Sequence, residues 1–235
     1  MTRSVDLSVV VPLYNEAPVL PRLVRTLCDT LEPLGRTFEL VLVDDGSSDG
    51  TGELVAASPA PVVPVLLSRN FGKEAAILAG LAAATGRAVV LMDGDLQHPP
   101  SVIPEMLALW DRGFEVVNAT KEDRGRESWL YRAAALVFYR LLGGALGAAM
   151  RGQSDFKLLD RRVVSVLVAL PERRRFFRAL VVWIGFKTAS VPFRVAPRAA
   201  GRTSWNVVGL VRYAVYGLVS FSSVPLHAIA WVGGG

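Results

Sequence analysis

Short runs of apolar residues alternate with longer segments in which apolar residues recur every three or four positions. Runs of the first kind are typical of buried strands, and segments of the second kind are typical of helices. The pattern predicts strands over residues 7–12, 38–43, 62–67 and 88–92, and helices over residues 18–31, 51–57 and 73–84. Strands separated by helices indicate right-handed βαβ units, so the expected fold class is α/β with a mostly parallel central sheet.

Three of these predicted strands are followed by short loops that contain acidic residues. Tyr14 and Glu16 follow the first strand, Asp44 and Asp45 follow the second, and Asp93 follows the fourth. In parallel sheets the ligand crevice lies at the carboxyl ends of the strands. We therefore expect these three loops to converge on one crevice.

The tract Asp93-Gly94-Asp95 carries the most specific chemistry. Side chains alternate along a strand, so the two carboxylates point the same way and repel each other unless a cation separates them. Gln97 adds a further oxygen, and oxygen ligands suit Mg²⁺ or Mn²⁺, which often also hold substrate phosphates. The alternative for an isolated pair of this kind is two solvated loop acids.

Motifs and composition narrow the choice of ligand. The sequence contains no G-x-G-x-x-G after the first strand and no G-x-x-x-x-G-K-[ST], which disfavours dinucleotide oxidoreductases and P-loop phosphotransferases. An acidic crevice needs a cation to accept a diphosphate, as in metal-dependent use of a nucleotide sugar. The chain is 51% hydrophobic with a net charge of +5, which favours an anionic membrane surface or a phosphorylated lipid over nucleic acid. The single cysteine, Cys28, excludes a disulfide framework.

Several motifs resemble those of family 2 glycosyltransferases of the GT-A fold. The matching segments are residues 10–16, 43–51, 68–73, 93–100 and 177–186. The form D-x-D-L-Q-H-P-P is similar to the polyprenyl-phosphate branch, which includes dolichol-phosphate mannose synthases and bacterial polyprenyl-phosphate glucosyltransferases. The resemblance implies a Rossmann-like GT-A catalytic domain over residues 1–200 and a membrane-associated segment over residues 201–235.

The resemblance also implies roles for single residues. It assigns nucleotide-sugar binding to Pro12, Tyr14, Glu16, Asp44, Asp45, Lys73, Asp93 and Gly94. It assigns Mg²⁺ or Mn²⁺ to Asp93, Asp95 and Gln97, and it leaves His98 a structural residue beside the prolines. Two alternatives stay open, because Asp44 can instead cap the next helix and Lys73 can instead lie at the surface.

A second set of residues is assigned to the acceptor. The expected catalytic residues are Asp95, Asp155, Lys121 and Arg124, and the expected acceptor-phosphate ligands are Arg132, Arg198, Arg202 and Thr203. Lys121 stands where the family usually has arginine, and Ser204 replaces a usual lysine, which Arg202 can offset. A phosphate acceptor is largely ionised near neutrality, so Asp155 is expected to orient groups and the reaction to invert the anomeric centre.

The C-terminal part predicts contact with a membrane. Residues 129–150 form either a core helix or an interfacial helix, and residues 204–220 are expected to form an interfacial helix. The resemblance implies that transmembrane helices follow the chain or that a partner anchors it, and a homo-oligomer stays open. The expected location is the cytoplasmic face of the cell membrane, without nucleic acid.

The predicted function is the inverting, metal-dependent transfer of a hexose from a UDP-glucose or GDP-mannose type donor to polyprenyl phosphate, either undecaprenyl or dolichyl. One alternative is a family 2 transferase that acts on a hydroxyl acceptor in polysaccharide or glycolipid synthesis. A second alternative is a membrane-bound scaffold without chemistry.

Overall fold

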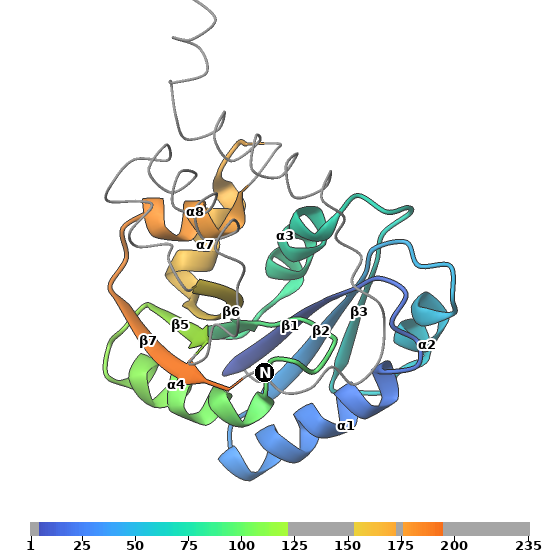
Figure 1. The fold of residues 1–235 in the computed structure, drawn as a ribbon, viewed down its shortest axis with the longest axis horizontal. Coiled ribbons are helices and arrows are strands. Elements are labelled where there is room, and N and C mark those ends of the chain that lie inside the picture. The colour runs from blue at the N-terminus through green and yellow to red at the C-terminus, as the bar shows by residue number, and fades with distance from the viewer. Residues whose placement is uncertain (1–4, 122–152, 173–175, 195–235) are drawn as a thin grey trace, which may run out of the picture. The chain divides into compact units, whose positions relative to one another are not determined.

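The structure, a computed structural model, describes residues 5–121, 153–172 and 176–194. A seven-stranded sheet forms its centre, in the order β3-β2-β1-β4-β6-β5-β7 (Figure 1). The strands are β1 (Leu7–Leu13), β2 (Phe38–Asp44), β3 (Val62–Leu66), β4 (Ala88–Leu91), β5 (Val116–Lys121), β6 (Gln153–Asp160) and β7 (Thr188–Phe193). The first four strands and the intervening helices confirm the α/β prediction.

The strand directions depart from a purely parallel sheet at one place. β1 pairs in parallel with β2 and β4, and β2 pairs in parallel with β3. β6 pairs antiparallel with β4, and the outermost strand β7 pairs in parallel with β5. The amino end of β6 therefore lies at the same edge of the sheet as the carboxyl end of β4.

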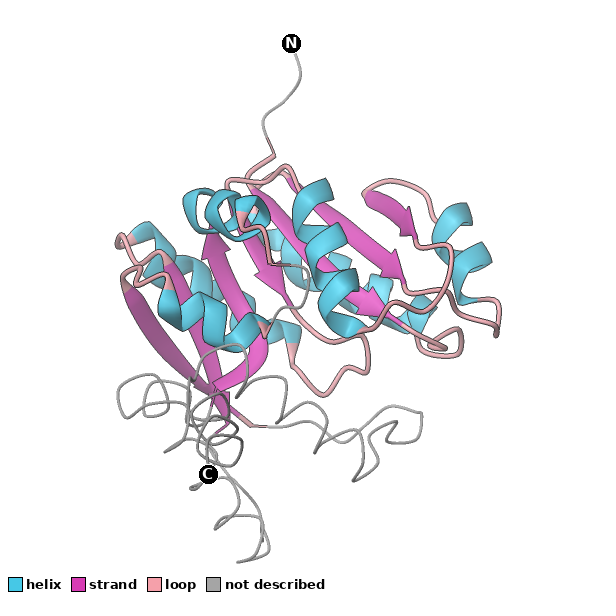
Figure 2. Cartoon of the chain, turned by 90° about the horizontal axis from the view of Figure 1, so that it is seen from above, coloured by secondary structure: helices cyan, strands magenta, loops and turns pink. Residues whose placement is uncertain are grey.

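Helices cover both faces of the sheet (Figures 1 and 2). The α-helices are α1 (Leu20–Leu31), α2 (Thr51–Ala57), α3 (Lys73–Ala83), α4 (Ile103–Asp111), α7 (Arg161–Ala169) and α8 (Phe177–Trp183). There are also two short 3₁₀-helices. η1 (Glu32–Leu34) follows α1, and η2 (Pro100–Val102) precedes α4. α1 and α4 lie on one side of the sheet, and α3 and α7 lie on the other (Figure 1).

The core follows from the periodicity of the elements that enclose it. α1 buries Leu20, Leu23, Leu27 and Leu31, which recur every three or four residues and so share one helix face. Alternate residues of β1 point to opposite faces of the sheet, so Val9 and Val11 join the core beside α1, whereas Val10 contacts the α3 side. On that side Gly80 of α3 is needed, because a Cβ there would overlap the side chain of Val10.

The chain divides into two compact units. The sheet, α1–α4 and α7 belong to the first unit, and α8 belongs to the second. Within α8 the apolar residues from Phe177 to Val181 are mostly buried, whereas Trp183 is 60% exposed. No helix in the described part of the chain has both the length and the hydropathy of a membrane span. The helices predicted within residues 129–150 and 204–220 lie outside the described residues.

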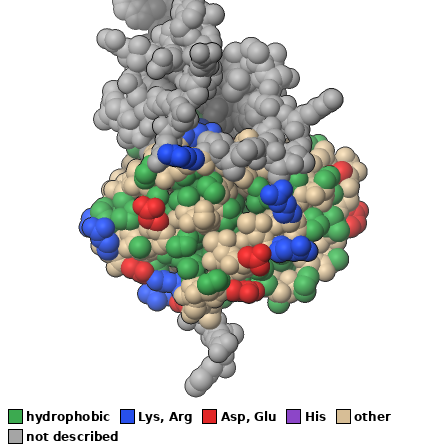
Figure 3. Space-filling model, turned by 60° about the horizontal axis from the view of Figure 1, so that its bottom comes forward, with side chains coloured by type: hydrophobic (Ala, Val, Ile, Leu, Met, Phe, Trp, Pro, Cys, Tyr) green, Lys and Arg blue, Asp and Glu red, His purple; other side chains and the backbone are tan. Residues whose placement is uncertain are grey.

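The face that carries α1 and α4 shows how charge is distributed on part of the surface. Lys and Arg side chains there are interspersed with Asp, Glu and hydrophobic side chains (Figure 3). The net charge of +5 is therefore not gathered into a basic patch on this face.

Candidate functional site

The loop after β1 is joined to the loop before α2 by side-chain hydrogen bonds. The backbone N–H of Asn15 donates to Ser47 Oγ at 2.9 Å, and Asn15 Oδ1 accepts from the backbone N–H of Ser48 at 2.9 Å. The backbone N–H of Glu16 donates to Thr51 Oγ1 at 2.9 Å. These bonds hold the loop while leaving Tyr14 46% exposed, so its ring is available for stacking against a ligand.

Asp45 connects three loops at this edge. Its backbone N–H donates to the carbonyl of Leu13, and its carboxylate accepts from the backbone N–H groups of Phe71 and Gly72 at 2.8 and 2.9 Å. The side chain is buried, so these two bonds to a charged acceptor are strong. Asp45 therefore positions the start of α3, a role that the sequence did not predict.

Asp44 is also buried, and it faces the turn that leads into α2. Its carboxylate accepts from the backbone N–H of Ser47 at 3.2 Å, and a Cβ on Gly52 in the first turn of α2 would lie 3.0 Å from Asp44 Oδ2. Asp44 therefore orders the turn before α2 but does not cap that helix, whose N-cap residue Gly50 has no side-chain hydrogen bond, so the capping alternative is wrong. Binding of the nucleotide by Asp44 stays a prediction.

A lysine lies between two carboxylates at the ends of β4 and β6. The antiparallel register pairs Leu91 with Lys157, and continuing it by two residues places Asp93 opposite Asp155. Lys73, the first residue of α3, places its Nζ 2.5 Å from Asp93 Oδ1 and 2.6 Å from Asp155 Oδ2. The side chains of Lys73, Asp93 and Asp155 are 34%, 30% and 11% exposed. Lys73 is therefore partly exposed at the surface and paired with two carboxylates, and its contact with a diphosphate stays a prediction.

The electrostatics of this cluster favour the charged lysine. Burial disfavours the ammonium, but the carboxylates of Asp155 and Asp93 outweigh burial and raise the pKa of Lys73 above its ordinary value. Lys73 therefore carries a positive charge at every physiological pH.

The turn after β4 is ordered by side chains that bond its backbone. Asp95 Oδ1 accepts from the backbone N–H of Gln97 at 3.0 Å, while Leu96 adopts a left-handed φ of 58°. His98 Nδ1 accepts from the backbone N–H of Asp93 at 3.3 Å. Burial lowers the pKa of His98, which favours the neutral ring that this bond requires.

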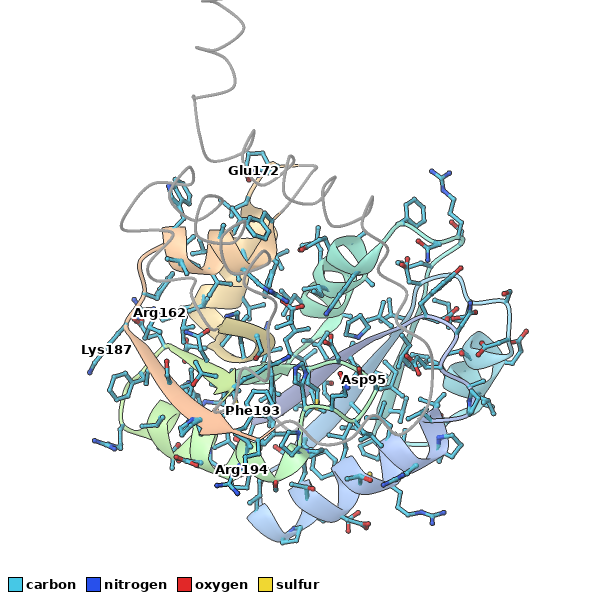
Figure 4. The ribbon with its side chains drawn as sticks, in the orientation of Figure 1. Asp95, Arg162, Glu172, Lys187, Phe193 and Arg194 are labelled. Carbon is cyan, nitrogen blue, oxygen red and sulfur yellow. The ribbon has the colours of Figure 1, made fainter. Side chains whose placement is uncertain are left out.

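His98 also packs in an aromatic cluster. Its ring stacks on Phe156 with centroids 5.3 Å apart and meets the edge of Phe193 at 5.6 Å. These contacts agree with the expected structural role of His98. Asp95 follows the end of β4 in the chain, and Figure 4 shows Phe193 and Arg194 at the end of β7.

Gly94 separates the two acids for a packing reason. A Cβ at this position would lie 2.5 Å from Leu13 Cδ2 and 3.4 Å from Val11 Cγ1. The glycine therefore lets the turn lie close against β1, which brings Asp93 and Asp95 next to the loop that carries Tyr14.

The donors at this edge fit a divalent cation only if a ligand completes its coordination. No group of three or more His, Cys, Asp or Glu side chains within the described ranges is arranged to hold a metal ion. Asp93 and Asp95 supply two carboxylates, and Mg²⁺ is commonly held by one or two carboxylates together with substrate phosphates. The residues therefore fit a metal that arrives with a diphosphate better than a metal in an all-protein cage.

The structure brings part of the predicted site together. Pro12 lies in β1 beside Val43 of β2, and Glu16 and Gln97 lie in loops at the same edge as Asp93 and Asp155. Lys121 ends β5 and is exposed. The residues outside the described ranges are Arg124, Arg132, Arg198, Arg202 and Thr203.

Sequence reasoning missed Lys157 on β6. Its side chain is fully buried, and its Nζ donates to Asn118 Oδ1 on β5 at 2.6 Å. Alternation along the strand puts Lys157 on the same face of the sheet as Asp155. Asp155 and Lys157 are polar residues on either side of the apolar Phe156, and this alternation would have indicated a strand.

Comparison with known proteins identifies relatives over nearly the whole chain. Residues 8–165 match the model of the family described as glycosyl transferase family 2. A prophage bactoprenol glucosyl transferase homolog of Escherichia coli is 37% identical over 231 residues, covering 97% of this chain and 76% of the relative. An uncharacterized glycosyltransferase of Synechocystis is 39% identical over 234 residues, covering 98% of this chain and 74% of the relative.

Solved structures show the same fold. Glucosyl-3-phosphoglycerate synthase from Mycobacterium tuberculosis, in complex with Mn²⁺, UDP-glucose and phosphoglyceric acid, superposes with a TM-score of 0.67 at 25% identity. The match covers 92% of this chain and 79% of that one. The same synthase with Mg²⁺ and UDP gives a TM-score of 0.69 at 22% identity, covering 94% and 80% of the two chains.

Proposed function

Because the chain belongs to glycosyl transferase family 2 and is a glycosyltransferase, we propose that it transfers a hexose from a nucleotide sugar to polyprenyl phosphate. The observation that carries this proposal is the cluster of Asp93, Asp155 and Lys73 at the carboxyl edge of the sheet, with Asp95 in the same turn as Asp93. That edge is where α/β folds bind ligands, and the cluster combines carboxylates for a cation with a lysine for a phosphate.

The relatives support the acceptor and the donor. Proteins named bactoprenol glucosyl transferase, from Shigella phages as well as Escherichia coli, match about 97% of this chain at 36–37% identity. The synthase with the same fold binds UDP-glucose. We take UDP-glucose as the first donor to test, with GDP-mannose as its rival, and we place the reaction at the cytoplasmic face of the membrane.

Several residues at this edge are suited to bind the nucleotide-sugar donor. Tyr14 offers an exposed ring against which a nucleobase stacks. Lys73 lies where it can turn from the carboxylates to the diphosphate. Mg²⁺ or Mn²⁺, held by Asp93 and Asp95 with Gln97 nearby, would neutralise the charge that develops on the leaving diphosphate.

The acceptor needs no strong base. A phosphate monoester has a second pKa of about 6, so its oxygen is largely ionised near neutrality. That oxygen attacks the anomeric carbon, the bond from carbon to the diphosphate oxygen breaks, and the bonding electrons leave with the nucleoside diphosphate. Direct attack inverts the anomeric centre, and Asp155 orients the reactants at the edge of the site.

One assay tests the proposal. Membranes that contain the protein are incubated with labelled UDP-glucose or GDP-mannose, Mg²⁺ or Mn²⁺, and undecaprenyl phosphate, and the lipid fraction is analysed. We expect a labelled lipid that mild acid hydrolyses. Asp95→Ala should abolish it, whereas Asp29→Asn, at an exposed position on α1, should not. Absence of a labelled lipid with every donor would refute the proposal.

The same assay addresses a hydroxyl acceptor. An alcohol must lose a proton when it attacks, so a hydroxyl acceptor would require a true general base. Under the phosphate proposal Asp155→Asn should retain measurable activity, because its role is to orient. Complete loss of activity in a folded Asp155→Asn protein would contradict the orienting role and indicate that Asp155 acts as a general base.

A further inference from the structure

Lys73 forms ion pairs with both Asp93 and Asp155. The lysine Nζ is within 2.6 Å of a carboxylate oxygen of Asp93, in the turn after β4, and of Asp155, in β6. The two carboxylates approach the same ammonium group, and such close like charges would repel each other without a cation between them. Lys73 therefore supplies the positive charge that lets the carboxylates of Asp93 and Asp155 lie close together.

We propose that Lys73 is the resident counterion of Asp93 and Asp155 and that it opposes metal binding until a diphosphate arrives. The inference rests on the proposed function, in which a nucleotide diphosphate reaches this edge of the sheet. A divalent cation at Asp93 would lie close to the lysine ammonium, and the two cations would repel each other. A diphosphate can accept both cations, so the metal and the nucleotide bind cooperatively.

The structure allows the lysine to change partners while its backbone stays fixed. The buried carboxylate of Asp45 holds the backbone N–H groups of Phe71 and Gly72, immediately before Lys73. The lysine side chain is 34% exposed and has a flexible four-carbon stem. Its ammonium can therefore turn from the carboxylates to a phosphate without moving α3.

The proposal predicts a gain of metal affinity when the lysine charge is removed. Binding of Mn²⁺ to the purified protein without nucleotide is measured from the paramagnetic resonance signal of free Mn²⁺. We expect Lys73→Met to bind Mn²⁺ about tenfold or more tightly than the wild type, because the repulsion between the two cations is gone. Loss of a lysine with a purely structural role would leave the affinity unchanged or lower it.

Lys187→Met is the matched control. Lys187 is exposed before the start of β7, with its Nζ 4.7 Å from the centre of the Phe114 ring. This variant loses the same charge at a position that lies well apart from Asp95 (Figure 4). Its affinity for Mn²⁺ should equal that of the wild type.

Addition of UDP tests the second half of the proposal. UDP should strengthen Mn²⁺ binding in the wild type by a larger factor than in Lys73→Met, because only the wild type gains a partner for the displaced lysine. If Lys73→Met does not fold, Lys73→Gln tests the same point, since its amide can still donate to Asp155.

Two results would overturn the inference. One is a nucleotide-free Mn²⁺ affinity in the neutral variants equal to or weaker than that of the wild type. The other is the absence of Mn²⁺ binding in every variant. A gain of affinity in Lys73→Met combined with no UDP or UDP-sugar binding would support the counterion and refute the proposed function, so the two failures can be told apart.

Discussion

Replacement of Asp45 by asparagine should destabilise the fold through the loop before α3. The buried carboxylate accepts one backbone N–H on each oxygen, from Phe71 and Gly72. An amide offers a single oxygen, so one bond is lost and one backbone N–H faces the amide NH₂ group. A hydrogen bond to a charged group contributes about 1.5–3 kcal/mol, and the remaining bond is weakened because its acceptor is no longer charged. We expect Asp45→Asn to lower the free energy of unfolding by about 2–4 kcal/mol.

Urea denaturation without nucleotide measures this loss directly. Each kcal/mol corresponds to about 2–4 °C in melting temperature for a protein of this size, so the melting temperature should fall by about 5–15 °C. Asp29→Asn makes the same chemical change at an exposed position on α1 and should change stability by less than about 0.5 kcal/mol. If Asp45→Asn matched that control, the two backbone bonds would contribute nothing and the structural role of Asp45 would be refuted.

Two further predictions concern packing and pH. Gly80→Ala places a methyl group against Val10 beneath α3 and should lower the free energy of unfolding by about 1–3 kcal/mol, measured by urea denaturation; an unchanged value would contradict the close contact. The pKa of Asp6 is lowered by hydrogen bonds from the Thr37 side chain and backbone, so its stabilisation is present above the ordinary pKa of 3.8 and is lost as the pH falls through the lowered value. The stability difference between wild type and Asp6→Asn should therefore be larger at neutral pH than in strong acid, and a difference independent of pH would refute this linkage.

The hydrophobic pattern was sufficient for the first half of the sheet. Strands predicted at residues 7–12, 38–43, 62–67 and 88–92 agree with β1 to β4 within one or two residues. The pattern worked because each βαβ unit is closed by residues close together in the chain, and because strands buried on both faces are apolar throughout.

The sequence was less informative about β6 and the contacts of its first residues. β6 lies between β4 and β5 and runs antiparallel to β4. The local pattern of apolar and polar residues does not indicate which strands pair with it or in which register. The sequence therefore proposed Asp155 as an acceptor-site acid without indicating that it lies opposite Asp93. It also left Lys73 open between the diphosphate and the surface, because a salt bridge to β6 spans 82 residues.

The sequence alone determined the α/β fold class, the family resemblance and the loops that carry Tyr14, Asp45 and Asp93. These depend on local apolar runs and on polar residues placed directly after strands, which are properties of neighbouring positions in the chain. The tertiary structure decided that Asp45 is buried against the loop before α3, and that Lys73 joins Asp93 to Asp155. The physical reason is strand register, because it sets which distant charges meet and so which of them must share a counterion.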